Sequence, residues 1–278
     1  MDTFDWTWKS FDGIDMASRG WAPDGKPKSA IALVHGHGEH VGRYAHVAAA
    51  LTARGYVLMG FDLRGHGRSG GPRGHTPSYA ALMDDISAFL DQVSGRYPGL
   101  PRFLYGHSLG GNLVINYVLR RKPDLRGAIA TGPWLKLAFE PPAAQVTLGK
   151  LMNGIAPGFT QNSNLDTKGL SHDAAVVAAY ENDPLVHEKI SARLFVEIYN
   201  TGLWALEHAA ELSLPLLLMH GSADPITSAK ASQEFAAKAG EMVTLKIWPD
   251  MYHEIHNEAA QAEVFKVMLA WLDDHLRG

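Results

Sequence analysis

Short apolar runs alternate with amphipathic helical patterns along most of the chain. The runs are strand-sized and predict buried strands at residues 30–34, 56–61, 102–105, 127–130, 214–219 and 243–248. Between them apolar residues recur at helical spacing, for example over residues 82–93. This alternation predicts an α/β fold, with a mostly parallel central sheet and helices on both faces. Residues 4–10 and 14–21 predict an antiparallel hairpin at one edge of the sheet, with Asp12-Gly13 as its turn.

The alternation of strand-sized apolar runs with helical patterns stops between residues 134 and 210. No good strand pattern is found there, and apolar residues recur at helical spacing over residues 148–155, followed by two more helical patterns. We therefore predict a helical cap at residues 134–210, inserted into an α/β core formed by residues 1–133 and 211–278. Ligands of open α/β sheets bind at the carboxyl edge of the strands, so the cap is expected to cover the site.

Composition and charge exclude several classes of protein. The formal net charge of −4 and the absence of long runs of like charge argue against a nucleic-acid partner. Cysteine is absent, which removes thiol nucleophiles, disulfides and thiolate zinc sites, and fits a reducing cytoplasm. No apolar run is long enough to span a bilayer, and the N-terminus does not have the pattern of a signal peptide. We expect a cytoplasmic protein, with any membrane contact peripheral and made through the cap.

Residues 106–110 read Gly-His-Ser-Leu-Gly and match the G-x-S-x-G motif. A predicted strand precedes the motif and a helical pattern follows it, which is the context that the motif requires. The turn is so tight that the serine is strained, and the flanking glycines let neighbouring backbone pass without a clash. The positive end of the following helix favours the negative charge that develops on a substrate. Ser108 is therefore the predicted nucleophile, although a glycine-rich turn before a helix can also arise by chance.

A serine hydroxyl needs a general base, and in α/β-hydrolases the chain order is serine, acid, histidine. Asp224 follows a late predicted strand and His253 follows the last one, so both fall at the same edge of the sheet. They are the predicted acid and base. His256 and His275 compete for the role of base, and His256 could be an ordinary polar surface residue. Asp250 competes for the role of acid but is too close to the histidine in sequence, and Asp224 could simply form an Asp-Pro turn.

A glycine-rich loop at residues 35–39, His-Gly-His-Gly-Glu, follows the first of the buried strands. Such a loop usually supplies one backbone N–H of an oxyanion hole, and the residue after the nucleophile supplies the other. The predicted donors are the N–H groups of His37 and Leu109, each contributing about 3 kcal/mol to transition-state stabilisation. A metal site at His35, His37 and His40 is disfavoured, because the loop does not hold three imidazoles on one side and no paired carboxylate is evident. We expect no metal, and expect His35 to hold the loop by hydrogen bonds.

Four segments carry more specific information than the serine motif alone. They are HGHGEH with GRY at residues 35–40 and 42–44, DLRGHGRS with GPRG at 62–69 and 71–74, GHSLGG at 106–111, and GSAD at 221–224 with His253-Glu254. In these segments the chain resembles the monoacylglycerol lipase and lysophospholipase branch of the α/β-hydrolases. The resemblance implies an α/β-hydrolase core with a helical cap, no cofactor, and hydrolysis of glycerol or phosphoglycerol esters of fatty acids. His37 departs from the family, which often has a small or aliphatic residue there.

The sequence thus predicts a serine ester hydrolase that cleaves a monoacylglycerol or lysophospholipid through an acyl-enzyme intermediate. Some apolar residues of the cap should line an acyl channel, while others only pack the cap onto the core; the candidates are Trp134, Leu135, Leu137, Phe139, Leu148, Leu151 and Met152. One alternative is a general carboxylesterase for short or aromatic esters, or a peptidase of related fold. Another is a non-catalytic hydrolase-like binding module, which is disfavoured because all three triad residues and the glycine loop are present.

Overall fold

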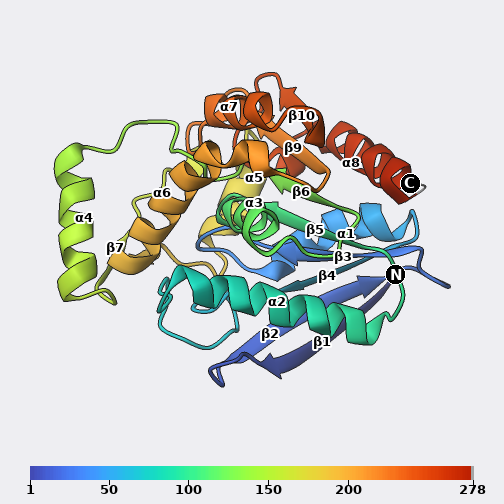
Figure 1. The fold of residues 1–278 in the computed structure, drawn as a ribbon. Helices are drawn as coiled ribbons and strands as arrows, with labels where there is room; N and C mark the ends of the chain where they lie inside the picture. Colours follow the sequence, from blue (N-terminus) through green and yellow to red (C-terminus); the bar gives the residue numbers. More distant parts are fainter. Residues whose placement is uncertain (277–278) are drawn as a thin grey trace.

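An eight-stranded sheet forms the centre of the computed structural model, which describes residues 1–276 (Figure 1). The strand order is β1-β2-β4-β3-β5-β6-β9-β10; β1 is antiparallel to β2 and β2 to β4, and the other neighbours are parallel. The predicted parallel sheet with an edge hairpin is confirmed. The strands are β1 (Asp2–Lys9), β2 (Asp15–Ala22), β3 (Ser29–Val34), β4 (Tyr56–Phe61), β5 (Arg102–His107), β6 (Gly127–Thr131), β9 (Leu216–Gly221) and β10 (Val243–Trp248).

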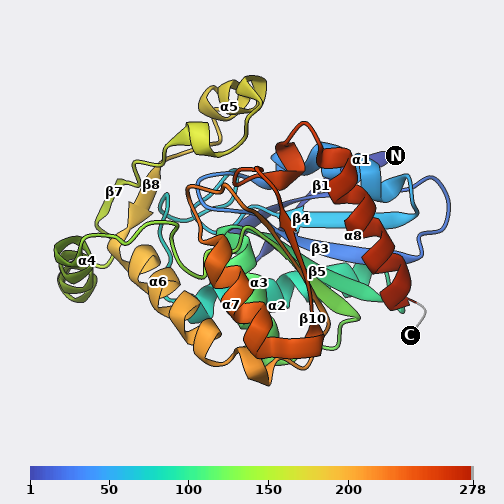
Figure 2. The same ribbon diagram turned by 90° about the horizontal axis from the view of Figure 1, so that it is seen from above.

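Helices cover both faces of the sheet, as Figure 2 shows from above. Side chains of β3 alternate between the two faces: Ala30, Ala32 and Val34 join one apolar cluster, and Ile31 and Leu33 join the other. The first cluster is completed by α2, α3 and α7, and the second by α1 and α8. The helices are α1 (Ala45–Thr52), α2 (Tyr79–Arg96), α3 (Leu109–Arg121), α7 (Ala229–Ala239) and α8 (Gln261–Leu276), with 3₁₀ turns at Val41–Tyr44, Thr167–Gly169, Ala209–Glu211, Gly240–Met242 and Ile255–Asn257.

A long segment connects β6 to β9 and holds α4 (Ala143–Ile155), β7 (Thr160–Asn162), α5 (Ala174–Glu181), β8 (Lys189–Ser191) and α6 (Ala192–Glu207). In Figure 1, α4 lies at the outer edge of the molecule, away from the sheet, and none of its residues is buried. By contrast, α6 buries Leu194, Ile198 and Leu206 in the cluster that also contains α3. The segment therefore holds one helix that shares the core and one that lies outside it.

Two details of the sequence prediction were wrong. We found no good strand pattern between residues 134 and 210, yet β7 and β8 pair there, with Thr160 opposite Ser191. Each has three residues, too few for an alternating pattern to be recognised. The strand predicted from residue 214 begins at Leu216, after Pro215, which has no N–H to donate to a neighbouring strand. The predicted core ends at residue 278, but residues 277 and 278 lie outside the described residues.

Candidate active site

Ser108 lies in the turn between β5 and α3, with φ 55° and ψ −116°, an unusual conformation for a residue with a side chain. Its backbone N–H donates to the carbonyl of Thr131 at 2.9 Å, which ties the turn to β6. A Cβ atom on Gly106 would approach the Gly110 carbonyl oxygen at 2.2 Å, and one on Gly110 would approach that of Val34 at 2.0 Å. The two motif glycines therefore permit the strained turn, and the turn places Ser108 at the amino end of α3.

Asp224 and His253 lie in the loops that follow the neighbouring parallel strands β9 and β10. The Nδ1–H of His253 donates to Asp224 Oδ2 at 2.7 Å, and both side chains are buried. The imidazole lies against the serine turn, because its ring centroid is 4.7 Å from that of His107, the residue before Ser108. The hydrogen bonds of this imidazole within the described residues all involve Nδ1. No described residue forms a hydrogen bond with Nε2 of His253, so the lone pair on Nε2 remains available as a base.

The charges of this pair favour an ionised acid and a basic histidine. Burial lowers the pKa of His253, but the Asp224 charge and hydrogen bond outweigh it, so the pKa lies above its ordinary 6.5. Burial likewise raises the pKa of Asp224, but His253 and His220 lower it by more, well below its ordinary 3.8. Asp224 is therefore a carboxylate at neutral pH and can stabilise an imidazolium at His253.

The three competitors for these roles lie in different surroundings. His256 is buried and stacks on Tyr44, so it is not the surface residue that it could have been from the sequence. Burial and neighbouring His107 hold the pKa of His256 well below its ordinary value, and a neutral imidazole results. His275 interacts with the carbonyl of Trp271 at the end of α8, and Asp250 is exposed.

The loop after β3 lies directly beside the nucleophile. A Cβ atom on Gly36 would be 3.2 Å from Cβ of Ser108. The next N–H, that of His37, makes no hydrogen bond within the described residues, and Leu109 is the first residue of α3, where an N–H has no partner within the helix. The structure thus brings both predicted donors to the serine turn, as N–H groups that make no hydrogen bond within the described residues.

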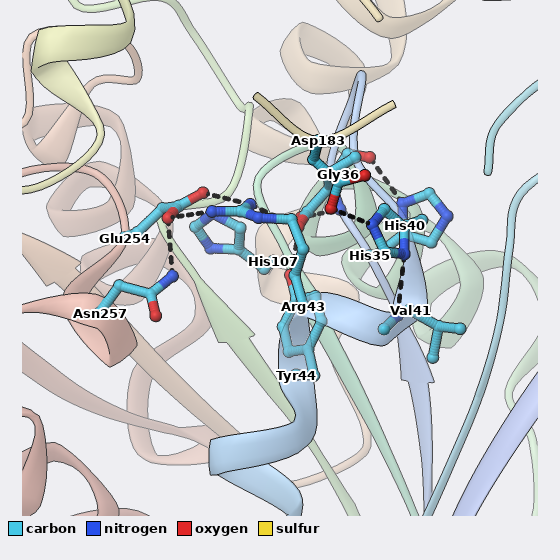
Figure 3. Close-up of polar contacts among 12 residues, drawn as sticks. His35, Gly36, His40, Val41, Arg43, Tyr44, His107, Asp183, Glu254 and Asn257 are labelled. Atoms are coloured by element: carbon cyan, nitrogen blue, oxygen red, sulfur yellow. Dashed lines mark hydrogen bonds and ion pairs between the residues drawn. The ribbon is translucent and has the colours of Figure 1, made fainter. Parts of the chain in front are cut away.

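A buried ion-pair network joins the loop after β3 to the loop of His253 (Figure 3). Arg43 donates to Glu39 at 2.8 Å and to both oxygens of Glu254, at 2.7 and 2.8 Å. The Tyr44 hydroxyl donates to Glu39 at 2.8 Å, and the amide of Asn257 donates to Glu254 at 2.7 Å. Burial raises the pKa of Glu39, but the charge of Arg43, the neighbouring histidines and the Tyr44 hydrogen bond together outweigh it and lower the pKa to about 2. The network fixes the two loops that carry the donor of His37 and the base.

The network was missed by sequence reasoning, although Glu39, Arg43 and Glu254 all lie in the segments that carry the family resemblance. Arg43 and Glu254 are 211 residues apart, so no local pattern could reveal their pairing. The signal that could have indicated the network was the presence of charged residues directly beside the predicted base and in the glycine-rich loop after β3.

The histidines in and near the loop after β3 face different partners. The Nδ1–H of His35 donates to the Gly36 carbonyl at 2.7 Å, and its Nε2 accepts from the Leu63 N–H at 2.8 Å. Instead of approaching His35, His40 faces Asp183 at 2.9 Å. The ring of His37 lies edge-on to two others, His66 and His187. Within residues 1–276 no group of three or more histidine, aspartate or glutamate residues is arranged to hold a metal ion.

The residues predicted to bind substrate are spread over two environments. Leu135 is buried in the core, whereas Trp134 is half-buried with its ring 6.4 Å from that of Phe195 on α6. Leu137 and Met152 are also half-buried. The other three are more than half exposed: Phe139, Leu148 and Leu151.

Known proteins are similar to this chain in sequence. A family model described as serine aminopeptidase, S33, matches residues 25–260. A monoacylglycerol lipase of Mycolicibacterium smegmatis is 35% identical over 95% of this chain and 95% of its own length. An uncharacterized abhydrolase domain-containing protein of Dictyostelium discoideum is 38% identical over 95% of this chain, which spans only 28% of that longer protein.

Solved structures agree with these relatives. The crystal structure of a monoacylglycerol lipase from Paleococcus ferrophilus superimposes with a TM-score of 0.85, at 32% identity, covering 99% of this chain and 100% of the other. The fold, the family match and the relatives all agree with the resemblance seen in the four motif segments. The chain is a serine hydrolase of carboxylic esters and belongs to the monoacylglycerol lipase family of the α/β-hydrolases.

Proposed function

We propose that this enzyme hydrolyses monoacylglycerols, with Ser108 as nucleophile, His253 as base and Asp224 as the acid that orients it. The observation that carries the proposal is the 2.7 Å hydrogen bond between His253 and Asp224, with the imidazole against the strained serine turn. Relatives and a solved structure that are named monoacylglycerol lipases support the choice of substrate.

The reaction proceeds through an acyl-enzyme. Ser108 Oγ attacks the ester carbonyl carbon while its proton passes to Nε2 of His253. The N–H groups of His37 and Leu109 hold the oxyanion, and Asp224 stabilises the imidazolium. The imidazolium then protonates the departing glycerol oxygen as the C–O bond breaks. Water adds to the acyl carbon with His253 as base, and the fatty acid leaves as the proton returns to Ser108.

Residues 134–210 act as the cap in this proposal. Trp134 and Leu137 follow the end of β6 closely, and Leu137 forms an isolated bridge with Thr227, close to Asp224 in sequence. Because both side chains are half-buried, they are suited to line the entrance of an acyl chain. Leu135 is fully packed in the core and serves the fold instead.

We infer that the outer face of α4 contacts a membrane or micelle. Leu148, Leu151 and Ile155 recur at helical spacing and are 57%, 57% and 72% exposed. Phe139 and Phe159 flank the helix and are also more than half exposed. Within residues 1–276 no helix is both long and apolar enough to cross a membrane. An exposed apolar stripe of this kind fits peripheral contact with the phase in which long-chain monoacylglycerols reside.

The electrostatics favour an ester over a peptide with a free amino terminus. An aminopeptidase needs an unpaired carboxylate near the nucleophile to bind the substrate ammonium. Glu39 and Glu254 are buried carboxylates whose charge reaches His253, and Arg43 binds both. Neither is free to hold an ammonium group.

A panel of substrates tests the proposal. Initial rates should be measured on monoacylglycerols of several chain lengths, a lysophospholipid, short p-nitrophenyl esters and an aminoacyl anilide, with Ser108→Ala as control. We expect long-chain monoacylglycerols to be cleaved best and the anilide not at all. Hydrolysis confined to short esters would contradict the lipid substrate while leaving the triad intact.

A further inference from the structure

His220 is a second buried imidazole on the acid of the triad. It is the fifth residue of β9, on the face of the sheet that carries α7, and it is fully buried. Its Nε2 lies 2.9 Å from Asp224 Oδ2, the same oxygen that binds His253. Its Nδ1 lies 2.8 Å from the hydroxyl of Ser232 on α7.

The hydrogen-bond partners fix the tautomer of this imidazole. A carboxylate oxygen can only accept, so the proton of His220 must be on Nε2 and point at Asp224. The Ser232 hydroxyl then donates to the lone pair on Nδ1. The carboxylate therefore selects the tautomer of His220, and the Ser232 hydroxyl supports it by donating to Nδ1.

The Asp224 carboxylate is held from both sides. Its Oδ1 accepts the backbone N–H groups of Ile226 at 2.7 Å and Thr227 at 3.0 Å. Its Oδ2 faces His253, His220 and the Thr227 hydroxyl, the last at 2.8 Å. Removing His220 would leave the backbone donors in place, so the carboxylate should keep its position but lose a partner that shares the charge of Oδ2.

We propose that His220 is a positioning residue that limits the basicity of His253 by binding the same carboxylate oxygen. The proposal rests on the triad proposed above. When His220 draws on the charge of Oδ2, less of that charge acts on His253. The base thereby stays unprotonated, and able to activate Ser108, to a lower pH.

Several other groups act on His253 and must stay unchanged in a test. Glu254 in its own loop and Glu39 from the loop after β3 raise its pKa together with Asp224, while burial lowers it. His107 of β5 and His256 also face the ring, and Arg43 binds the two glutamates. None of these forms a hydrogen bond or ion pair with His220 or Ser232, so variants at those two positions leave their polar contacts in place.

The test is the pH dependence of kcat/KM for a short p-nitrophenyl ester, which avoids the lipid interface. His220→Leu fills a similar volume without a donor, and we expect the acid limb to move up by about 0.5–1 pH unit, with rates at pH 6 reduced about three- to tenfold. His220→Gln keeps an amide donor and should retain the wild-type limb to within about 0.3 unit. Above pH 8.5 all rates should agree to within about threefold.

Ser232→Ala provides a second variant in case His220→Leu does not fold, which thermal unfolding would show. Loss of the hydroxyl removes the hydrogen bond to Nδ1 of His220, which weakens the donation from Nε2 to Asp224, so the limb should move in the same direction by a smaller amount. An equal fall in rate at every pH, with an unchanged limb in the Leu and Ala variants, would overturn the proposal. Failure of a fluorophosphonate to label the wild-type enzyme would instead overturn the triad itself.

Discussion

Helices α3 and α4 have the same length, 13 residues, and opposite surroundings. Eleven residues of α3, from Leu109 to Leu119, are buried, whereas α4 buries none. The first helix begins at the nucleophile and is enclosed by the sheet, α2 and α6. The second packs against α6 and exposes an apolar stripe. Burial of α3 therefore serves the geometry of the site and stability, and exposure of α4 leaves its side chains free for substrate or membrane.

The largest effect is expected at the amino end of α3. Ser108→Ala removes the nucleophile, so kcat should fall about 10⁴-fold or more, with the residual rate due to the oxyanion donors. Circular dichroism and thermal unfolding should show an intact fold. Retention of more than a hundredth of the wild-type rate on esters would show that another residue is the nucleophile.

The next largest difference is expected in how much each helix contributes to the free energy of unfolding. Leu113→Ala in α3 removes a side chain that is fully buried, and should lower the free energy of unfolding by about 2–5 kcal/mol. Leu148→Ala in α4 truncates a side chain that is 57% exposed, and should change it by no more than about 0.5 kcal/mol. Denaturant titration measures both. Equal losses would mean that α4 is packed more closely than the structure shows.

Acid should destabilise the core, which holds buried neutral histidines, and not α4, which contains no histidine. Burial and the charge of His253 lower the pKa of His107 to about 4, and burial keeps those of His66 and His256 well below 6.5. Below pH 6.5 the unfolded chain binds protons that these folded residues do not. His107 should therefore cost about 1.4 kcal/mol of stability per pH unit between about pH 6.5 and 4, and His66 and His256 should add losses of the same sign.

His253 acts in the opposite sense, because its pKa is raised in the folded state; its contribution is complete below pH 6.5 and is lost as the pH rises through the folded value. The several lowered groups should dominate. Urea titrations at pH 7.5, 6 and 5 should give a steadily falling free energy of unfolding. A free energy that is constant over this range would contradict the account, and His256→Gln should make the fall less steep.

The smallest effect is expected on the exposed stripe of α4. Changing Leu148 and Leu151 together to Gln should reduce the rate on long-chain monoacylglycerol in vesicles about three- to tenfold, since less apolar area reaches the lipid. The rate on a short p-nitrophenyl ester should not change. Gln145→Ser, also on the exposed surface of α4, is the matched control. Equal rates on vesicles for all three proteins would argue against lipid contact through α4.

The sequence predicted the parts of the fold that have a local signature. Strands buried on both faces appear as continuous apolar runs, and the strained turn at Ser108 requires the glycines of its motif. Asp224 and His253 could be located because parallel strands end at one edge of the sheet. The structure places Nδ1 of His253 2.7 Å from Oδ2 of Asp224, at the edge of the sheet where the serine turn also lies.

Other features depend on contacts that no local pattern records. An apolar stripe looks alike in α3 and α4, and only the tertiary structure shows that one is covered. The pairing of Arg43 with Glu254 and the contact of His220 with Asp224 arise from loops and strands brought together by the sheet. His220 lies four residues before Asp224, yet only the pleat of β9 and the position of Ser232 show that it points at the carboxylate.

The most direct test of the central claim is covalent labelling of the nucleophile. The protein should be treated with a fluorophosphonate and digested, and the modified peptide sequenced by mass spectrometry. We predict a single adduct on Ser108, absent in Ser108→Ala and formed far more slowly in His253→Ala and Asp224→Asn. An adduct on a different residue, or equal labelling of the wild type and His253→Ala, would contradict the proposed triad.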